Sequence, residues 1–173
     1  MNLTTRQIVV IGMLGAISIV LAVSPLGFIP MPTGVHVTIM HIPAIIGGIW
    51  QGPVSGALVG LIFGIYALLN PIPAFFSDPL VSVLPRLLIG VTAYYVYRGW
   101  FHRQTKVIAA ALVGSATNTI GVLGMIALRG YLPFEAVAAV ALSNGILEMI
   151  VSAIVTALII RALSKVRGFS LLS

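Results

Sequence analysis

Arg86 and Glu148 stand out because each is an ionisable side chain inside an apolar stretch of the sequence. A charge within a membrane-spanning helix is costly, so such residues usually face the protein interior or a water-filled cavity. A buried arginine can meet an anionic or carbonyl group of a ligand, and a carboxylate can accept hydrogen bonds from hydroxyl or amide groups. The alternative is an internal ion pair in which Arg86 and Glu148 only fix two helices to each other.

Both residues belong to polar stripes with the four-residue spacing of one helical face. Ser82 precedes Arg86 by four positions, and Asn144 precedes Glu148 by the same interval. Asn118 lies in a third apolar stretch, and its amide can both donate and accept hydrogen bonds. The stripes predict a polar pocket that is shared by three helices and opens to the outside of the membrane.

Two histidines lie near this predicted pocket along the chain. His36 follows Pro32 and Gly34 in a connection that could close over a ligand, whereas His41 suits a polar anchor at the membrane surface. Together with Asp78 they are residue types that bind metal, but their spacing is not a recognised ligand pattern. We therefore expect neither a metal ion nor a cofactor.

The composition indicates a single integral membrane domain over residues 1–173. Only 12 of the 173 residues are charged, 60% are hydrophobic, and the mean hydropathy is +1.16. A soluble domain carries roughly a quarter charged residues. The net charge of +6 lies beside apolar segments, where it favours contact with anionic lipid in the bilayer rather than with nucleic acid.

Proline, glycine and charged residues divide the chain into six apolar segments. These predict an all-α bundle of six transmembrane helices over residues 7–23, 39–50, 53–69, 80–96, 107–128 and 134–163. The second segment is short for a full span of about 20 residues and could be re-entrant. With six spans, seven basic residues fall on one side and one on the other, which predicts that both termini are cytoplasmic. The seven are Arg6, Arg98, Arg103, Lys106, Arg161, Lys165 and Arg167, and the one is Arg129.

Small residues recur every four positions in two of these segments. Gly12 and Ala16 lie in the first, and Gly52, Gly56, Gly60 and Gly64 continue this spacing from just before the third and through it. Such spacing lets helix backbones approach closely. We expect internal packing for the third segment. For the first, packing inside the bundle and docking onto a membrane partner both stay open.

Signatures of common enzymes are missing from the sequence. No Gly-rich loop precedes a lysine in the pattern of an ATPase, and neither metalloprotease nor serine-hydrolase motifs occur. A membrane enzyme acting on lipid or isoprenoid substrates would need clustered carboxylates or histidines, which the sequence lacks. A scaffold or channel-forming oligomer with a structural Arg86–Glu148 pair is the other alternative.

The chain resembles the substrate-binding S components of energy-coupling factor (ECF) vitamin importers of prokaryotic plasma membranes. The resemblance covers nearly the whole chain, and two stretches carry it best: HIPAIIGGIWQGPVSGALVGLIFG at 41–64 and LVSVLPRLLIG at 80–90. It implies a vitamin-binding subunit without enzymatic activity, partnered by a transmembrane coupling subunit and two cytoplasmic ATPases. It also implies a ligand site in the outer half of the bundle, which includes Arg86, Asn118 and Asn144, and docking of the coupling subunit on Gly12 and Ala16.

Within that family the two stretches are most similar to the pantothenate branch. One membrane-buried arginine suits the carboxylate of pantothenate, and Glu148 with the asparagines suits its hydroxyl and amide groups. Folate, riboflavin, a pyridoxine-like or hydroxymethylpyrimidine compound, lipoate and cobalamin are the alternative ligands. The sequence therefore predicts vitamin uptake, with pantothenate as the first candidate.

Overall fold

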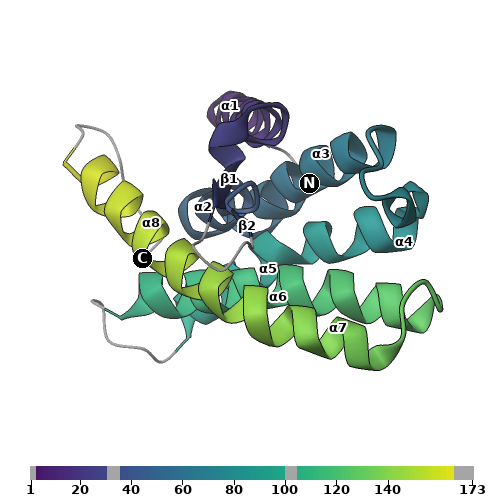
Figure 1. The fold of residues 1–173 in the computed structure, drawn as a ribbon. Helices are drawn as coiled ribbons and strands as arrows, with labels where there is room; N and C mark the ends of the chain where they lie inside the picture. Colours follow the sequence, from purple (N-terminus) through teal and green to yellow (C-terminus); the bar gives the residue numbers. More distant parts are fainter. Residues whose placement is uncertain (1–2, 31–35, 100–104, 166–173) are drawn as a thin grey trace.

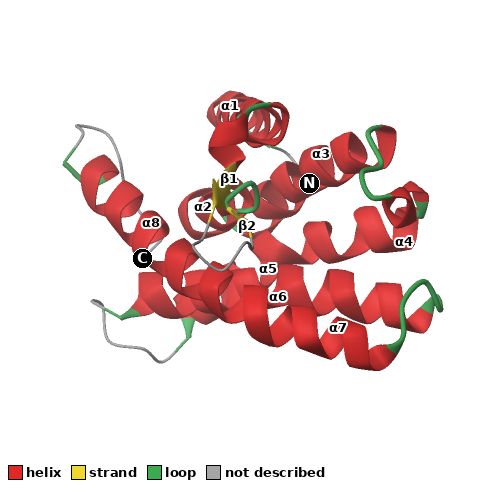
Figure 2. Cartoon of the chain, viewed as in Figure 1, coloured by secondary structure: helices red, strands yellow, loops and turns green. Residues whose placement is uncertain are grey.

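The computed structural model describes residues 3–30, 36–99 and 105–165, which are mostly helical (Figures 1 and 2). Five short elements accompany the α-helices: the 3₁₀ turns Pro25–Gly27 and Ala74–Ser77, the π-helical turn Ala141–Gly145, and the strands β1 (Phe28–Pro30) and β2 (His36–Thr38). The α-helices are α1 (Thr5–Val23), α2 (Ile42–Gln51), α3 (Pro53–Leu69), α4 (Pro79–Ser82), α5 (Leu84–Arg98), α6 (Lys106–Leu128), α7 (Phe134–Val140) and α8 (Ile146–Leu163).

The helices follow the six predicted segments to within three residues. Four helical stretches are long and apolar enough to cross a membrane: Thr5–Val23, Pro79–Arg98, Lys106–Leu128 and Phe134–Leu163. Two of these stretches are interrupted. The fourth predicted segment breaks at Val83 into α4 and α5, and the sixth contains a π-helical turn, Ala141–Gly145, between α7 and α8. Neither interruption was predicted from the sequence.

The short helix α2 forms the centre of the bundle. It contacts α1, α3, α5, α6 and α8, and every residue from Ile42 to Ile49 is buried. A helix that is apolar on all sides is stable only when it is surrounded by other elements. At about 1.5 Å per residue, its ten residues extend about 15 Å, roughly half the hydrocarbon thickness of a bilayer.

Glycines allow α2, α3 and α5 to cross at backbone contact. A Cβ atom added at Gly56 would lie 2.7 Å from the Cα of Gly90 and 2.8 Å from the Cα of Gly48. One turn further along α3, a Cβ at Gly60 would lie 2.0 Å from the carbonyl oxygen of Arg86. The prediction of internal packing for this stripe is therefore confirmed, and the stripe also fixes the position of the Arg86 backbone.

A β-hairpin forms where the sequence predicted an irregular connection. Strands β1 and β2 pair antiparallel, with Phe28 opposite Thr38 and Pro30 opposite His36. The residues 31–35 that join them, including Pro32 and Gly34 of the connection predicted to close over a ligand, lie outside the described residues. The hairpin lies near the middle of the bundle in Figure 1 and contacts α8 through β2.

Candidate functional site

A cavity of about 570 Å³ lies between the hairpin and helices α3, α5, α6 and α8. This volume is in the range of small-molecule sites, about 300–1,000 Å³. Arg86, Asn118, Asn144 and Glu148, which the sequence placed on three separate polar stripes, all line it. The other lining residues are Ala22, Phe28, Thr38, Met40, Phe63, Tyr66, Ala67, Asn70, Ile72, Phe76, Thr119, Val122, Leu123 and Val140.

The break between α4 and α5 positions the guanidinium of Arg86. Pro85 has no N–H and cannot continue the helical hydrogen bonding, which leaves the carbonyl of Val81 without its usual helical donor. The Nη1 atom of Arg86 donates to this carbonyl at 3.4 Å and to the carbonyl of Ser82 at 2.6 Å. The side chain of Arg86 is therefore held against the backbone of α4.

Two aromatic rings complete the surroundings of Arg86. The Cζ atom lies 4.8 Å from the ring centroid of Phe63 and 4.9 Å from that of Phe76, which are cation–π distances. Arg86 is only 6% exposed, and its Nε has no hydrogen-bond partner among the described residues. Buried polar groups are normally paired, so this cation is poised to meet a polar or anionic group.

Glu148 connects the hairpin to two helices. Its Oε1 accepts hydrogen bonds from the backbone N–H of Thr38 at 3.0 Å and from the Thr38 hydroxyl. Its Oε2 accepts from the Thr119 hydroxyl at 3.1 Å. Arg86 and Glu148 do not form the ion pair that the sequence left open. Within residues 3–30, 36–99 and 105–165, the one ion pair joins Arg129 to Asp78.

The two asparagines reach the cavity from α6 and from the π-helical turn. The Oδ1 of Asn118 is buried without a hydrogen-bond partner in the part of the chain that the structure describes. Asn144 lies within the π turn, a rare conformation that is frequent at functional sites. Gly145 next to it allows close approach to α6, because a Cβ there would lie 2.9 Å from the Cγ2 of Thr119.

Three other sequence candidates have different positions. The hydroxyl of Ser82 donates to the carbonyl of Phe76, and Ser82 does not line the cavity but supports Arg86 through its own carbonyl. The backbone of His36 is in β2, and its side chain lies outside the described part of the structure. The interpretation of His41 as a surface anchor is wrong: it is buried, with Nε2 3.1 Å from the Ser115 hydroxyl and 2.8 Å from that of Ser152.

Four residues of the site were missed from the sequence. Thr38 and Thr119 hold Glu148, and Phe63 and Phe76 flank Arg86. In an apolar sequence, phenylalanine and threonine give no signal that separates a site from ordinary packing. Alternation over Val35, His36, Val37 and Thr38 is the one pattern that could have indicated the strand.

At the loop end of the cavity, Asp78 links the α3–α4 connection to the α6–α7 connection. Its carboxylate caps α4 by accepting from the N–H of Leu80 at 2.9 Å, and it also accepts from Arg129 Nε at 2.6 Å and Tyr131 Oη at 3.2 Å. The hydrogen bond from Leu80, followed by those from Arg129 and Tyr131, lowers the pKa of Asp78 from its ordinary value of 3.8. The connection carrying Phe76 is thereby tied to the end of α6.

This lowered pKa predicts a pH-dependent stability. The contribution of Asp78 is present in full above its ordinary pKa of 3.8 and is lost as pH falls below that value through the folded-state pKa. We expect Asp78→Asn to lower the thermal unfolding midpoint at neutral pH, and the gap to wild type to narrow below pH 3.8. Unfolding scans in detergent measure this, with the exposed Glu135→Gln as control. A gap that stays constant with pH would contradict the assignment.

Three similarities to known proteins bear on what this site does. The family model described as "ECF transporter, substrate-specific component" matches residues 6–160. The pantothenic acid transporter PanT of Lactococcus lactis subsp. cremoris (strain MG1363) is 32% identical to this chain, over 80% of this chain and 83% of PanT. A solved structure titled "Structure and mechanism of the S component of a bacterial ECF transporter" matches with a TM-score of 0.66 at 22% identity, covering 92% of this chain and 96% of that one.

Proposed function

The chain belongs to the family of substrate-specific (S) components of ECF transporters, and from that premise we propose that it binds pantothenate. As a member of this family it is a multi-pass membrane protein and a transporter subunit, not a catalytic enzyme. The proposed ligand site is the cavity beneath the β1–β2 hairpin. The similarity to PanT over most of both chains supports this choice among the vitamins.

The observation that carries the proposal is the incomplete pairing of two cavity residues. The Nε of Arg86 and the Oδ1 of Asn118 are buried and lack hydrogen-bond partners in the described structure. Pantothenate offers a carboxylate for the guanidinium, and an amide N–H or hydroxyl for the amide oxygen. Asn144 and the remaining acceptor capacity of Glu148 can take the other polar groups of the ligand, and the apolar lining fits its carbon chain.

The proposal is tested by finding which ligand the protein carries. We expect mass spectrometry of small molecules released from the detergent-purified protein to detect pantothenate, and calorimetry to give one saturable pantothenate site. Folate, riboflavin, pyridoxine, hydroxymethylpyrimidine, lipoate and cobalamin serve as competitors. If the protein binds one of these compounds tightly and does not bind pantothenate, the S-component assignment stands and the proposed ligand is wrong.

The proposed topology has six membrane spans and cytoplasmic termini. The seven-to-one distribution of basic residues supports it. In this topology the α3–α4 connection and the Asp78–Arg129 pair lie outside the cell, so the ligand cavity opens outward.

Single cysteines test this topology directly, because the chain has none of its own. We expect Ala74→Cys, exposed in the α3–α4 connection, to react with a membrane-impermeant maleimide added to intact cells. Lys165→Cys, exposed after α8, should react only when the membrane is opened. The reverse pattern, or labelling of both sites from one side, would refute the six-span orientation.

We further propose that α1 docks onto the transmembrane coupling subunit of an ECF module, which would also contain two ATPases. Gly12 and Ala16 are exposed, and no atom of the described structure lies within 4 Å of a Cβ placed on Gly12. Gly15 lies on the adjoining, inward side of α1, and a Cβ there would lie 2.7 Å from the Cδ1 of Ile62, so internal packing uses Gly15. This division of faces favours docking over packing for Gly12 and Ala16.

Bulky residues on the exposed face should separate docking from folding. We expect Gly12→Leu/Ala16→Leu to abolish copurification with the coupling subunit, because close helix approach is blocked, while ligand affinity stays unchanged. Ile17→Ala, which is exposed on α1 but lies off the four-residue stripe of Gly12 and Ala16, is the control and should assemble normally. Normal assembly of the double variant would exclude this face, and loss of ligand binding would indicate an internal role instead.

A further inference from the structure

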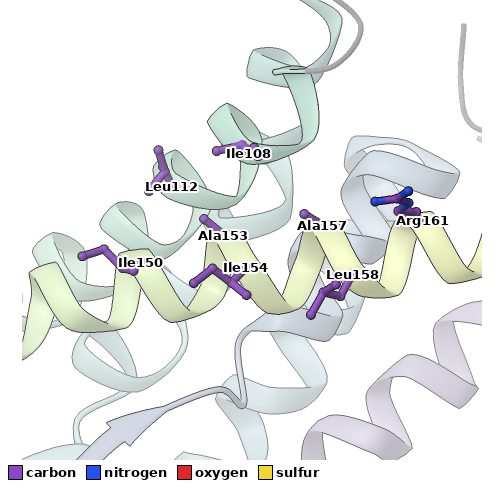
Figure 3. A pocket seen from close by; sticks show the side chains of 8 residues that line it. All are labelled: Ile108, Leu112, Ile150, Ala153, Ile154, Ala157, Leu158 and Arg161. Carbon is purple, nitrogen blue, oxygen red and sulfur yellow. The ribbon is translucent and has the colours of Figure 1, made fainter.

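A second hollow, separate from the ligand cavity, runs along the outside of the bundle between α6 and α8. It has a volume of about 400 Å³, and α8 provides most of its lining while α6 contributes Ile108 and Leu112 (Figure 3). Ala153 forms part of the floor and is 8% exposed, whereas Leu158 on the rim is 61% exposed. The lining is apolar except for Arg161. We call this feature the α6–α8 groove.

Arg161 closes one end of the α6–α8 groove with an uncompensated positive charge. In Figure 3 it lies beyond Ala157 and Leu158, towards the end of α8. No described residue forms an ion pair with it, and the three acidic residues of the chain, Asp78, Glu135 and Glu148, are placed elsewhere. Lys165 adds a second exposed cation one turn further on, past the end of the helix.

The dimensions of the groove match one leaflet of a bilayer. From Ile150 to Arg161 the helix rises about 16 Å, at about 1.5 Å per residue. Half of the hydrocarbon thickness of a bilayer is about 15 Å. A partner transmembrane helix would need an apolar surface about twice as long, whereas one acyl chain needs only this length, with its headgroup at the charged end.

We propose that the α6–α8 groove binds an anionic phospholipid, with one acyl chain along α8 and the headgroup phosphate on Arg161. The guanidinium is suited to phosphate because it can donate two parallel hydrogen bonds. The small side chains of Ala153 and Ala157 leave room for the acyl chain. Ile150, Ile154 and Leu158 form the walls of the groove. On the topology proposed above, this lipid belongs to the cytoplasmic leaflet.

Native mass spectrometry of the full chain, titrated with phosphatidylglycerol or phosphatidylcholine, tests the proposal. We expect wild type to retain one phosphatidylglycerol in preference to phosphatidylcholine. Arg161→Gln should weaken phosphatidylglycerol retention about fivefold, the effect expected for one cation at an anionic lipid surface. Ala157→Phe, which fills the groove, should reduce both lipids to background.

Two matched variants separate the groove from general lipid contact. Arg98→Gln removes another exposed cation outside the groove, and Ala162→Phe adds the same ring at an exposed position of α8. Both should retain the lipid, and thermal unfolding checks that all four variants fold. The proposal is overturned if Arg98→Gln weakens retention as much as Arg161→Gln, or if Ala157→Phe leaves it unchanged. It is also overturned if Ala157→Phe instead dissociates a dimer of the chain, which would make a second copy the occupant.

Discussion

Arg86→Ala is expected to weaken pantothenate binding by about 2–5 kcal/mol, a loss of roughly 30- to 5,000-fold in affinity. The guanidinium is buried between Phe63 and Phe76, and the described residues offer it carbonyl oxygens but no carboxylate. A bound carboxylate would therefore be its counter-ion. Removing the guanidinium leaves that carboxylate buried and unpaired, which is the main source of the expected loss.

Calorimetry with two ligands isolates this contact. Wild type should prefer pantothenate over the corresponding alcohol, in which the carboxylate is reduced, and Arg86→Ala should lose that preference. Arg98→Ala, which removes an exposed arginine at the far end of α5, should bind both ligands as wild type does. An unchanged preference for the acid in Arg86→Ala would exclude Arg86 as the carboxylate contact and direct attention to His36.

Glu148→Ala is expected to reduce both folding stability and ligand affinity. The carboxylate accepts hydrogen bonds from the N–H and hydroxyl of Thr38 and from the hydroxyl of Thr119. Its loss leaves these three donors without an acceptor. A hydrogen bond to a charged group contributes about 1.5–3 kcal/mol, so we expect the free energy of unfolding to fall by about 3 kcal/mol or more. Affinity should fall at least about tenfold, equivalent to about 1.4 kcal/mol, because β2 is no longer held over the cavity.

Thermal unfolding and calorimetry on a small set of variants check this role. Glu148→Gln keeps one carbonyl acceptor for Thr38 and should show less than half of the loss in stability. Glu135→Ala, an exposed carboxylate on α7, is the matched control and should behave as wild type. In a double-mutant cycle, Glu148→Ala and Thr38→Ala should be strongly non-additive. Additive losses would show that Glu148 does not act through the hairpin.

The helices and the ionisable residues of the site were predictable because membrane helices carry strong sequence signals. Apolar runs defined the segments, and the rarity of charge made Arg86 and Glu148 conspicuous. Residues four apart share a helical face, so the spacing alone placed Asn144 on the same face as Glu148. The cavity joins these two residues with Arg86 and Asn118 as the polar stripes predicted.

The sequence could not predict which groups satisfy these charges. A ligand-binding carboxylate and one that holds a hairpin look the same in an apolar helix, and only the pairing of Thr38 with Glu148 distinguishes them. The break at Val83 precedes Pro85, and only the structure reveals that the side chain of Arg86 pairs with the freed carbonyl of Val81. No residue pattern marks the π turn at Ala141–Gly145. The burial of His41 against Ser115 and Ser152 likewise follows from the central position of α2.

The most direct test of the central claim is a structure of the purified protein with pantothenate bound. We predict the ligand in the cavity beneath the β1–β2 hairpin, with its carboxylate within hydrogen-bond distance of the Arg86 guanidinium and a polar group on the amide of Asn118. Glu148 should keep Thr38 and Thr119 as partners. Pantothenate bound with its carboxylate directed away from Arg86, or outside this cavity, would contradict the account.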